Sequence, residues 1–153
     1  MPQLHKGDRL MVFPRMPAHL RAWAHDEASR AEVSVSAWIA DVMALAVGRC
    51  DLVREVDVPE LPAVDLVVPS TRYELLDSHQ PSTTVRLLRP VTIEIRRRAV
   101  EVAPEAAQLT PMTTYVTCTL AAAMHAPLYG AISSDAAVRA HPKRPVQEAL
   151  LAV

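Results

Sequence analysis

Residues 35–47 are the most constraining stretch of this sequence, because they predict a helix that is apolar on nearly every side. One stripe at helical spacing consists of Val35, Ile39, Val42, Met43 and Ala46. Trp38, Leu45 and Val47 extend the apolar surface around the cylinder. Ser34 is placed to act as the N-cap, and Gly48 closes the C-terminal end. One neighbouring helix cannot cover such a surface, so this helix needs several partners.

The residues before this helix predict a short strand and a first helix. Residues 9–16 are apolar and partly alternate, as in a strand. Pro14 restricts that strand to an edge or a two-stranded ribbon, where one row of backbone donors needs no partner. Pro17 suits the start of a helix over residues 18–31, whose apolar side chains recur at spacings of three and four.

The rest of the chain predicts a linker and further elements. Residues 51–84 are rich in proline and acids, which is typical of a linker. We expect these elements beyond residue 50: a short strand at Leu66–Val68, a strand at Val91–Ile95, a short helix at Arg96–Ala103, a helix at Met112–Met124 started by Thr110 and Pro111, and a last helix at Pro145–Leu151.

Composition excludes several classes of function. Only three glycines are present, which excludes glycine-rich phosphate loops. The six histidines lack metal-ligand spacing, and no nucleophile motif is found, so we expect no metal, no cofactor and no catalytic residue. The net charge of −1 provides no global basic field, so a case for nucleic acid must rest on local arginines, such as those in residues 1–24 and 85–98.

The sequence also predicts a compartment. No signal peptide is recognisable at the N-terminus, and no apolar run approaches the length of a membrane span. Cys50 and Cys118 are then expected to be unpaired thiols in a reducing environment. We therefore expect a cytoplasmic protein with no membrane partner.

The order of strand, proline, helix, break and Ser-capped helix resembles the ribbon-helix-helix superfamily of Arc-type and MetJ-type repressors. The resemblance covers about the first third of the chain and rests on these residues: Arg15, Met16 and Pro17 at the strand–helix junction, Leu20, Trp23 and Ala24 on the first helix, and Ser34, Val35, Ser36 and Ile39 on the second. It implies a mainly α fold with a short antiparallel ribbon, which enters the DNA major groove.

The resemblance also implies the residues that contact DNA. If Val12, Pro14 and Met16 face the helices, alternation turns the intervening side chains outward. The groove-reading positions are then Met11, Phe13 and Arg15, with Arg9 on the same strand. By the same resemblance, the start of the second helix binds a phosphate through Ser34, Val35 and Ser36.

The C-terminal half contains a possible second copy of the module. Trp38, Ile39 and Met43 lie over Tyr115, Val116 and Leu120 when the two helices are aligned. In the same comparison Val91–Ile95 takes the place of the first strand, and Thr92, Glu94 and Arg96 become its outward positions. One chain would then form its own pseudo-dimer, with residues 91–95 pairing with residues 10–16. The alternative is a homodimer of N-terminal modules with an unrelated C-terminal domain.

These inferences divide the chain into a module at 1–50, a linker at 51–84, a possible second module at 85–130 and a tail at 131–153. They predict a DNA-binding regulator that is not an enzyme: a transcriptional repressor, or an accessory protein of plasmid or phage origin. Its partners would be double-stranded DNA and itself. The alternative is an interaction module, such as an antitoxin or anti-factor whose C-terminal half binds a partner protein.

Overall fold

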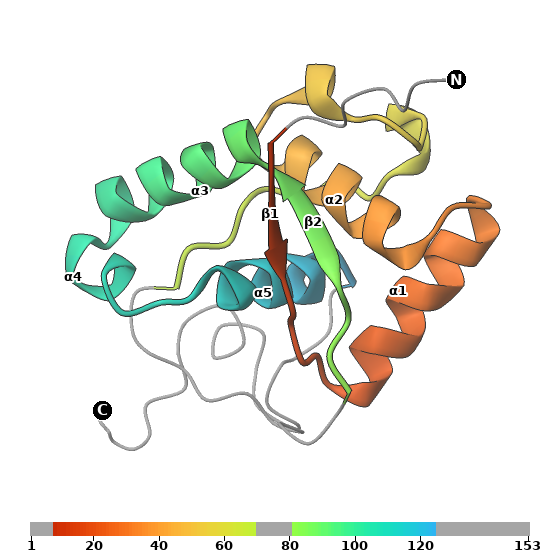
Figure 1. The fold of residues 1–153 in the computed structure, drawn as a ribbon, viewed down its shortest axis with the longest axis horizontal. Coiled ribbons are helices and arrows are strands. Elements are labelled where there is room, and N and C mark those ends of the chain that lie inside the picture. Colours follow the sequence, from red (N-terminus) through yellow and green to blue (C-terminus); the bar gives the residue numbers. More distant parts are fainter. Residues whose placement is uncertain (1–7, 70–80, 125–153) are drawn as a thin grey trace.

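The computed structural model describes residues 8–69 and 81–124 (Figure 1). This part of the chain is mainly helical and carries a two-stranded antiparallel sheet, as the sequence predicts. The elements are β1 (Arg9–Val12), α1 (Ala18–Arg30), α2 (Val35–Ala46), the 3-10 turns η1 (Cys50–Leu52) and η2 (Val58–Glu60), β2 (Val85–Leu88), α3 (Arg89–Val102), α4 (Pro104–Ala107) and α5 (Met112–Met124). The helix expected at residues 145–151, and the tail that contains it, lie outside the described residues.

The two strands form a ribbon within one chain. Met11 lies opposite Arg86, and Val12 lies opposite Val85. Backbone bonds continue the same register beyond both ends of the strands: the Arg89 amide donates to the Asp8 carbonyl at 3.0 Å, and the Thr83 amide donates to the Pro14 carbonyl at 2.9 Å. The partner of the N-terminal strand is therefore a later segment of the same polypeptide.

The partner strand is not the one that the sequence predicted. Residues 91–95 lie in α3, so both the strand expected there and its pairing with residues 10–16 are wrong. Val91 and Ile95 fit either structure, because residues four apart share a helix face as well as a strand face. Pro90 decides for the helix, since it occupies the first turn, where its missing N–H costs nothing. The observed strand, β2, lies immediately before this helix, α3.

The helices of the N-terminal third are confirmed, and so is the helix at Met112–Met124. The Ser34 hydroxyl oxygen accepts a 3.1 Å bond from the Ala37 amide and caps α2. Gly48 follows α2 with a φ of 77°, a conformation that favours glycine. The expected N-cap Thr110 instead donates its hydroxyl to the Ala106 carbonyl at 2.8 Å, because α5 begins two residues later.

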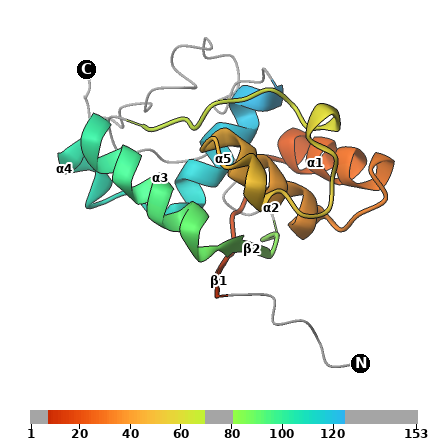
Figure 2. The same cartoon turned by 90° about the horizontal axis from the view of Figure 1, so that it is seen from above.

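Helix α2 obtains its partners from the chain itself. It packs against α1, the ribbon strand β2 and α5, so its neighbours come from both halves of the sequence (Figure 2). Trp38 and Ile39 are fully buried, and the Trp38 ring meets Trp23 edge-on at a centroid distance of 5.3 Å. The apolar circumference of this helix is explained by burial among these three elements.

The segment between η1 and β2 joins the same core where the structure describes it. The strand expected at Leu66–Val68 is wrong, because the sheet found in residues 8–69 and 81–124 consists of β1 and β2, and this stretch belongs to neither. It instead runs extended along two helices: the Leu66 amide donates to the Ala46 carbonyl at 3.2 Å, and the Val67 amide donates to the Thr119 hydroxyl at 3.1 Å. From the same segment, Val56 and Leu61 are buried in the hydrophobic core that residues of both halves of the sequence form together.

Burial repeats between the two halves of the fold. Every buried residue from 12 to 28 has a buried counterpart 71 positions later. The matched sets are 12, 14, 16, 17, 20, 24 and 28, and 83, 85, 87, 88, 91, 95 and 99. Helices α2 and α5 repeat their buried positions at a shift of 77, which places Trp38 over Tyr115. The shift is six residues larger for this second pair of helices because the C-terminal half has six additional residues in the region of α4, between α3 and α5.

The two cysteines are free, as the sequence predicts. Cys50 is exposed, whereas Cys118 is buried on α5. Burial raises the pKa of the Cys118 thiol to about 12, because the thiolate would lose its hydration there. Only Cys50 is therefore accessible to thiol reagents in the folded state.

Candidate nucleic-acid interface

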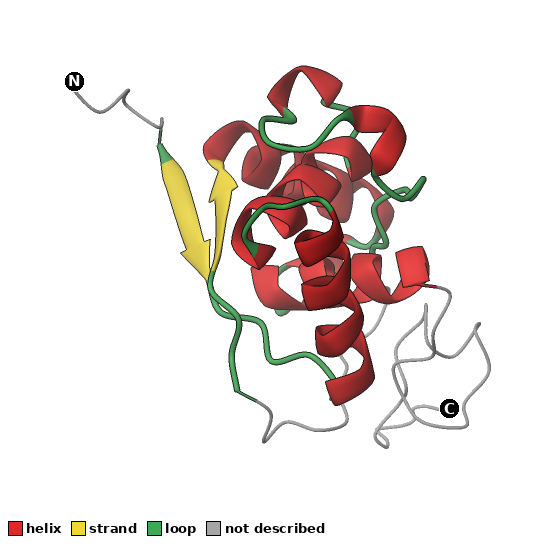
Figure 3. Cartoon of the chain, turned by 90° about the vertical axis from the view of Figure 1, so that its right-hand side faces the viewer, coloured by secondary structure: helices red, strands yellow, loops and turns green. Residues whose placement is uncertain are grey.

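The ribbon lies along one side of the helical body and turns one face away from it (Figure 3). The expected alternation along the first strand is confirmed: Val12, Pro14 and Met16 are buried, and the residues between them are exposed. Six side chains make up this outer ribbon face: Met11, Phe13 and Arg15 from the first strand and its extension, and Ser82, Thr84 and Arg86 from the second. Met11 and Phe13 are 45% and 51% exposed.

The hydrogen-bond pattern of the ribbon brings the outward side chains together. Pro14 and Thr83 belong to the inward-facing set, and the Thr83 amide donates to the Pro14 carbonyl, so these two residues form a hydrogen-bonded pair. In this register the outward pair Met11 and Arg86 is a non-hydrogen-bonded pair. Side chains of such pairs stand closer than those of hydrogen-bonded pairs. The outer ribbon face is therefore a continuous surface of paired side chains.

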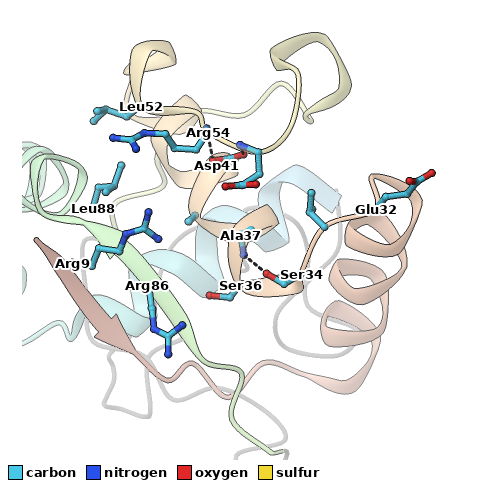
Figure 4. Close-up of a pocket in the computed structure, with 13 residues that line it drawn as sticks. Arg9, Glu32, Ser34, Ser36, Ala37, Asp41, Leu52, Arg54, Arg86 and Leu88 are labelled. Atoms are coloured by element: carbon cyan, nitrogen blue, oxygen red, sulfur yellow. Dashed lines mark hydrogen bonds between the residues drawn. The ribbon is translucent and has the colours of Figure 1, made fainter. Parts of the chain in front are cut away.

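A hollow of about 710 Å³ lies between the ribbon and the N-terminus of α2 (Figure 4). The ribbon lines it with Arg9, Arg86 and Leu88, and α2 lines it with Ser36 and its neighbours. Arg54 enters from the segment that follows η1. Three arginines thus lie near the start of one helix, and three acids, Glu32, Asp41 and Glu55, line the same hollow, so the formal charges of its side chains balance.

The start of α2 adds backbone donors to the same hollow. The Ser34 hydroxyl satisfies the Ala37 amide. The amides of Val35 and Ser36 belong to the first turn, where no earlier carbonyl of the helix is available to them. The positive end of the helix dipole points the same way. Of the predicted phosphate-binding residues, Ser34 and Ser36 line the hollow together with Arg9 of the ribbon, and Val35 is not part of its lining.

A buried carboxylate holds Arg54 at this position. Asp41 lies on α2 and is only 2% exposed. Its carboxylate accepts three backbone bonds, from the amides of Arg54 at 2.9 Å and of Glu55 and Val56 at 2.8 Å each. A carboxylate that accepts three amides satisfies its own burial and fixes the loop that donates them. Asp41 therefore orders the segment from which the Arg54 side chain projects.

The residues predicted to face DNA from the second half are not on the ribbon. Thr92 is buried in α3 and donates its hydroxyl to the Arg89 carbonyl at 2.8 Å. Glu94 lies on α3 and forms ion pairs with Arg97 and Arg98. Arg96 is exposed on α3. A strand at residues 91–95 would turn all three outward, but these residues form a helix, which moves them away from the outer ribbon face.

Two arginines of α3, Arg97 and Arg98, bond acids, and Arg98 also bonds the backbone of α2. Hydrogen bonds from Arg97 and Arg98 lower the pKa of Glu94 to about 2. Arg97 also bonds Glu101 at 2.5 Å. The Arg98 guanidinium donates to the Val47 carbonyl at 2.7 Å, which ties α3 to the C-terminal end of α2. This arrangement favours a solvated, ion-paired helix face over a set of phosphate contacts.

Four residues of the site were missed from the sequence: Ser82, Thr84 and Arg86 of the ribbon, and Arg54 of the hollow. A signal for the first three was present. Thr83, Val85 and Leu87 alternate with them, and Pro90 marks a helix start just beyond, as Pro17 does in the first half. No local signal places Arg54, because its position depends on the long-range bond to Asp41.

Asp8 and Arg89 contact each other at the end of the ribbon where β1 begins and β2 ends. The Arg89 guanidinium forms an ion pair with the Asp8 carboxylate, and the backbone bond between the same residues lies beside it. The carboxylate raises the pKa of Arg89. This exposed pair joins the residue before β1 to the first residue of α3 and so marks where the outer ribbon face ends.

The chain matches no family model, no curated protein and no solved structure with which it was compared. Within residues 8–69 and 81–124, no helix has the length and apolar character needed to cross a membrane. The same residues contain no cluster of three or more histidine, cysteine or acidic side chains placed to hold a metal ion.

Proposed function

We propose that this protein is a non-enzymatic DNA-binding regulator of the ribbon-helix-helix type, which inserts its ribbon into the major groove of double-stranded DNA. The observation that carries the proposal is the outer ribbon face, a two-stranded antiparallel surface with Arg15 and Arg86 on it. The major groove accepts a two-stranded ribbon, and arginine is the commonest side chain that reads guanine there.

The hollow beside the ribbon supports the same function. A groove-bound ribbon brings the adjacent helix start toward the sugar-phosphate backbone. The helix start at Ser34 and Ser36 and the guanidinium groups of Arg9 and Arg54 then lie where a phosphate passes. Phosphate contacts of this kind position a protein on the duplex, whereas the groove contacts provide the sequence preference.

The repeated burial pattern supports an internal pseudo-dimer, in which one chain supplies both modules. β1, α1 and α2 form one module, and β2, α3 and α5 form the other. The two modules contact each other through the pairing of β1 with β2 in the ribbon and through the packing of α2 against α5. A homodimer is then not needed to complete the ribbon, because the second strand belongs to the same molecule. A reducing, cytoplasmic location is consistent with two free thiols and with a DNA target.

The test is recovery of genomic DNA by the full chain. Immobilised protein is incubated with sheared DNA of its source organism, and the retained fragments are sequenced at several salt concentrations. We expect a small number of loci to be enriched over a protein-free resin. We also expect affinity for those loci to fall with salt, at a slope of log K against log salt of about −2 to −4, because each phosphate contact contributes about −0.9.

Uniform recovery of the genome at the level of the protein-free resin would contradict the proposal. Binding that does not depend on salt would contradict it as well, since arginine contacts to phosphate release counterions. Single-stranded fragments of the enriched loci serve as the control, because a ribbon that reads a major groove requires a duplex.

A second candidate function is supported by the two apolar side chains on the outer ribbon face. Met11 and Phe13 are about half exposed and lie next to each other on the same ribbon face, and neighbouring exposed apolar side chains are typical of a protein interaction site. A protein partner, as for an antitoxin or anti-factor, would bury them. Co-purification of one stoichiometric protein, together with no enrichment of genomic loci, would favour this function over the first.

A further inference from the structure

The two strands of the ribbon present unlike side chains at equivalent positions. With the shift of 71 residues, Met11, Phe13 and Arg15 correspond to Ser82, Thr84 and Arg86. The arginine is retained in both strands. The other two positions are large and apolar on the first strand but small and hydroxylated on the second. A homodimer would present the same three side chains twice, and this chain does not.

The register shows how these differences are distributed along the ribbon. Because Met11 lies opposite Arg86 and Thr83 bonds Pro14, the same register places Phe13 opposite Thr84. Arg15 is then opposite Ser82. The outer ribbon face therefore has a polar end, where Arg15 stands beside Ser82, and a mixed end, where Arg86 stands beside Met11. Phe13 and Thr84 form the centre.

We propose that the DNA target is a non-palindromic duplex site that is read by a single chain, a proposal that rests on the function proposed above. Each arginine suits a guanine, because its guanidinium matches the O6 and N7 acceptors. Met11 and Phe13 offer only apolar contact, which suits the methyl group of thymine, whereas serine and threonine hydroxyls bond either kind of base. The centre and the mixed end therefore favour thymine, and the polar end does not.

The ribbon geometry sets the spacing of the two guanine contacts. Arg15 and the residue opposite Arg86 are four positions apart on the first strand. At about 3.3 Å per residue this is roughly 13 Å along the ribbon. The rise of the double helix is about 3.4 Å per base pair. The two G·C pairs are thus expected about four base pairs apart, with thymine beside one of them and between them.

The experiment is selection from a random duplex library by the full chain, followed by sequencing. We expect one consensus without two-fold symmetry, with two G·C positions about four base pairs apart. Arg15→Ala should relax one of these positions, and Arg86→Ala the other. Met11→Ser makes the mixed end resemble the polar end, and it should remove the thymine preference beside the Arg86 position while leaving the Arg15 position unchanged.

A palindromic consensus that both arginine variants relax at both half-sites would overturn this inference and would leave the DNA-binding function standing. Selection that yields no consensus at all would overturn both, because the ribbon would then read no sequence. Retention of the thymine preference in Met11→Ser would overturn the assignment of the mixed end.

Discussion

Replacing Arg15 and Arg86 together with alanine is expected to remove sequence-specific DNA binding from a protein that remains folded. Both side chains are exposed on the outer ribbon face, one on each strand. A bidentate arginine–guanine contact is worth about 1–3 kcal/mol of discrimination, so the double variant should lose on the order of 30-fold to 10⁴-fold in affinity for its selected site. Fluorescence anisotropy with that duplex measures the loss.

The matched control is Arg97→Ala. It removes one exposed guanidinium, but from the ion-paired face of α3, where Arg97 contacts Glu94 and Glu101. We expect its affinity to stay within about threefold of the parent, since exposed ion pairs contribute little and this face is not part of the ribbon. Equal losses in Arg97→Ala and in Arg15→Ala would show that binding depends on total charge and not on the outer ribbon face.

Replacing Asp41 with alanine is expected to cost about 2–4 kcal/mol of unfolding free energy, which is large for a single polar side chain. The carboxylate is buried and accepts three backbone amides from residues 54–56. Hydrogen bonds to a charged group are each worth about 1.5–3 kcal/mol, and they are not fully additive. Urea denaturation followed by far-ultraviolet circular dichroism measures the change.

Asp51→Ala is the control for this prediction, because it removes an acid of the same type from the surface. The Asp51 carboxylate bonds only the Arg49 guanidinium in the described part of the chain, at 2.8 Å and 2.9 Å, and it is exposed. A loss of no more than about 0.5 kcal/mol is expected there. If Asp41→Ala were equally mild, the loop that carries Arg54 would not depend on this carboxylate, and the ordered hollow would need another explanation.

The sequence predicted the elements whose local signals agree with one another. In α2 a serine cap, a helical apolar stripe and a closing glycine all indicate the same boundaries, and the structure confirms them. Residues 91–95 gave conflicting signals, because β-branched alternation favoured a strand while Pro90 favoured a helix start. Alternation alone predicts a strand at residues 91–95, about six residues after the start of the observed strand β2.

The site was predictable in part for the same reason. Alternation along the first strand correctly turned Met11 and Phe13 outward, because a period of two is a local property. Alternation at residues 82–87 indicates a second strand, but its pairing with β1 joins residues more than 70 positions apart, and no local pattern encodes that pairing. Arg54 likewise reaches the hollow only through the contact of its backbone with Asp41.

The most direct test of this account is a cross-link between the two strands of the ribbon. Met11 and Arg86 form a non-hydrogen-bonded pair, whose Cα separation of about 4.5 Å is compatible with a disulfide. The variant Met11→Cys/Arg86→Cys is prepared with Cys50→Ser, because Cys50 is exposed and Cys118 is buried. After oxidation at low concentration, non-reducing electrophoresis should show a monomer that migrates faster than its reduced form. A disulfide-linked dimer, or a monomer that does not form the disulfide, would contradict the pairing of β1 with β2 in one chain.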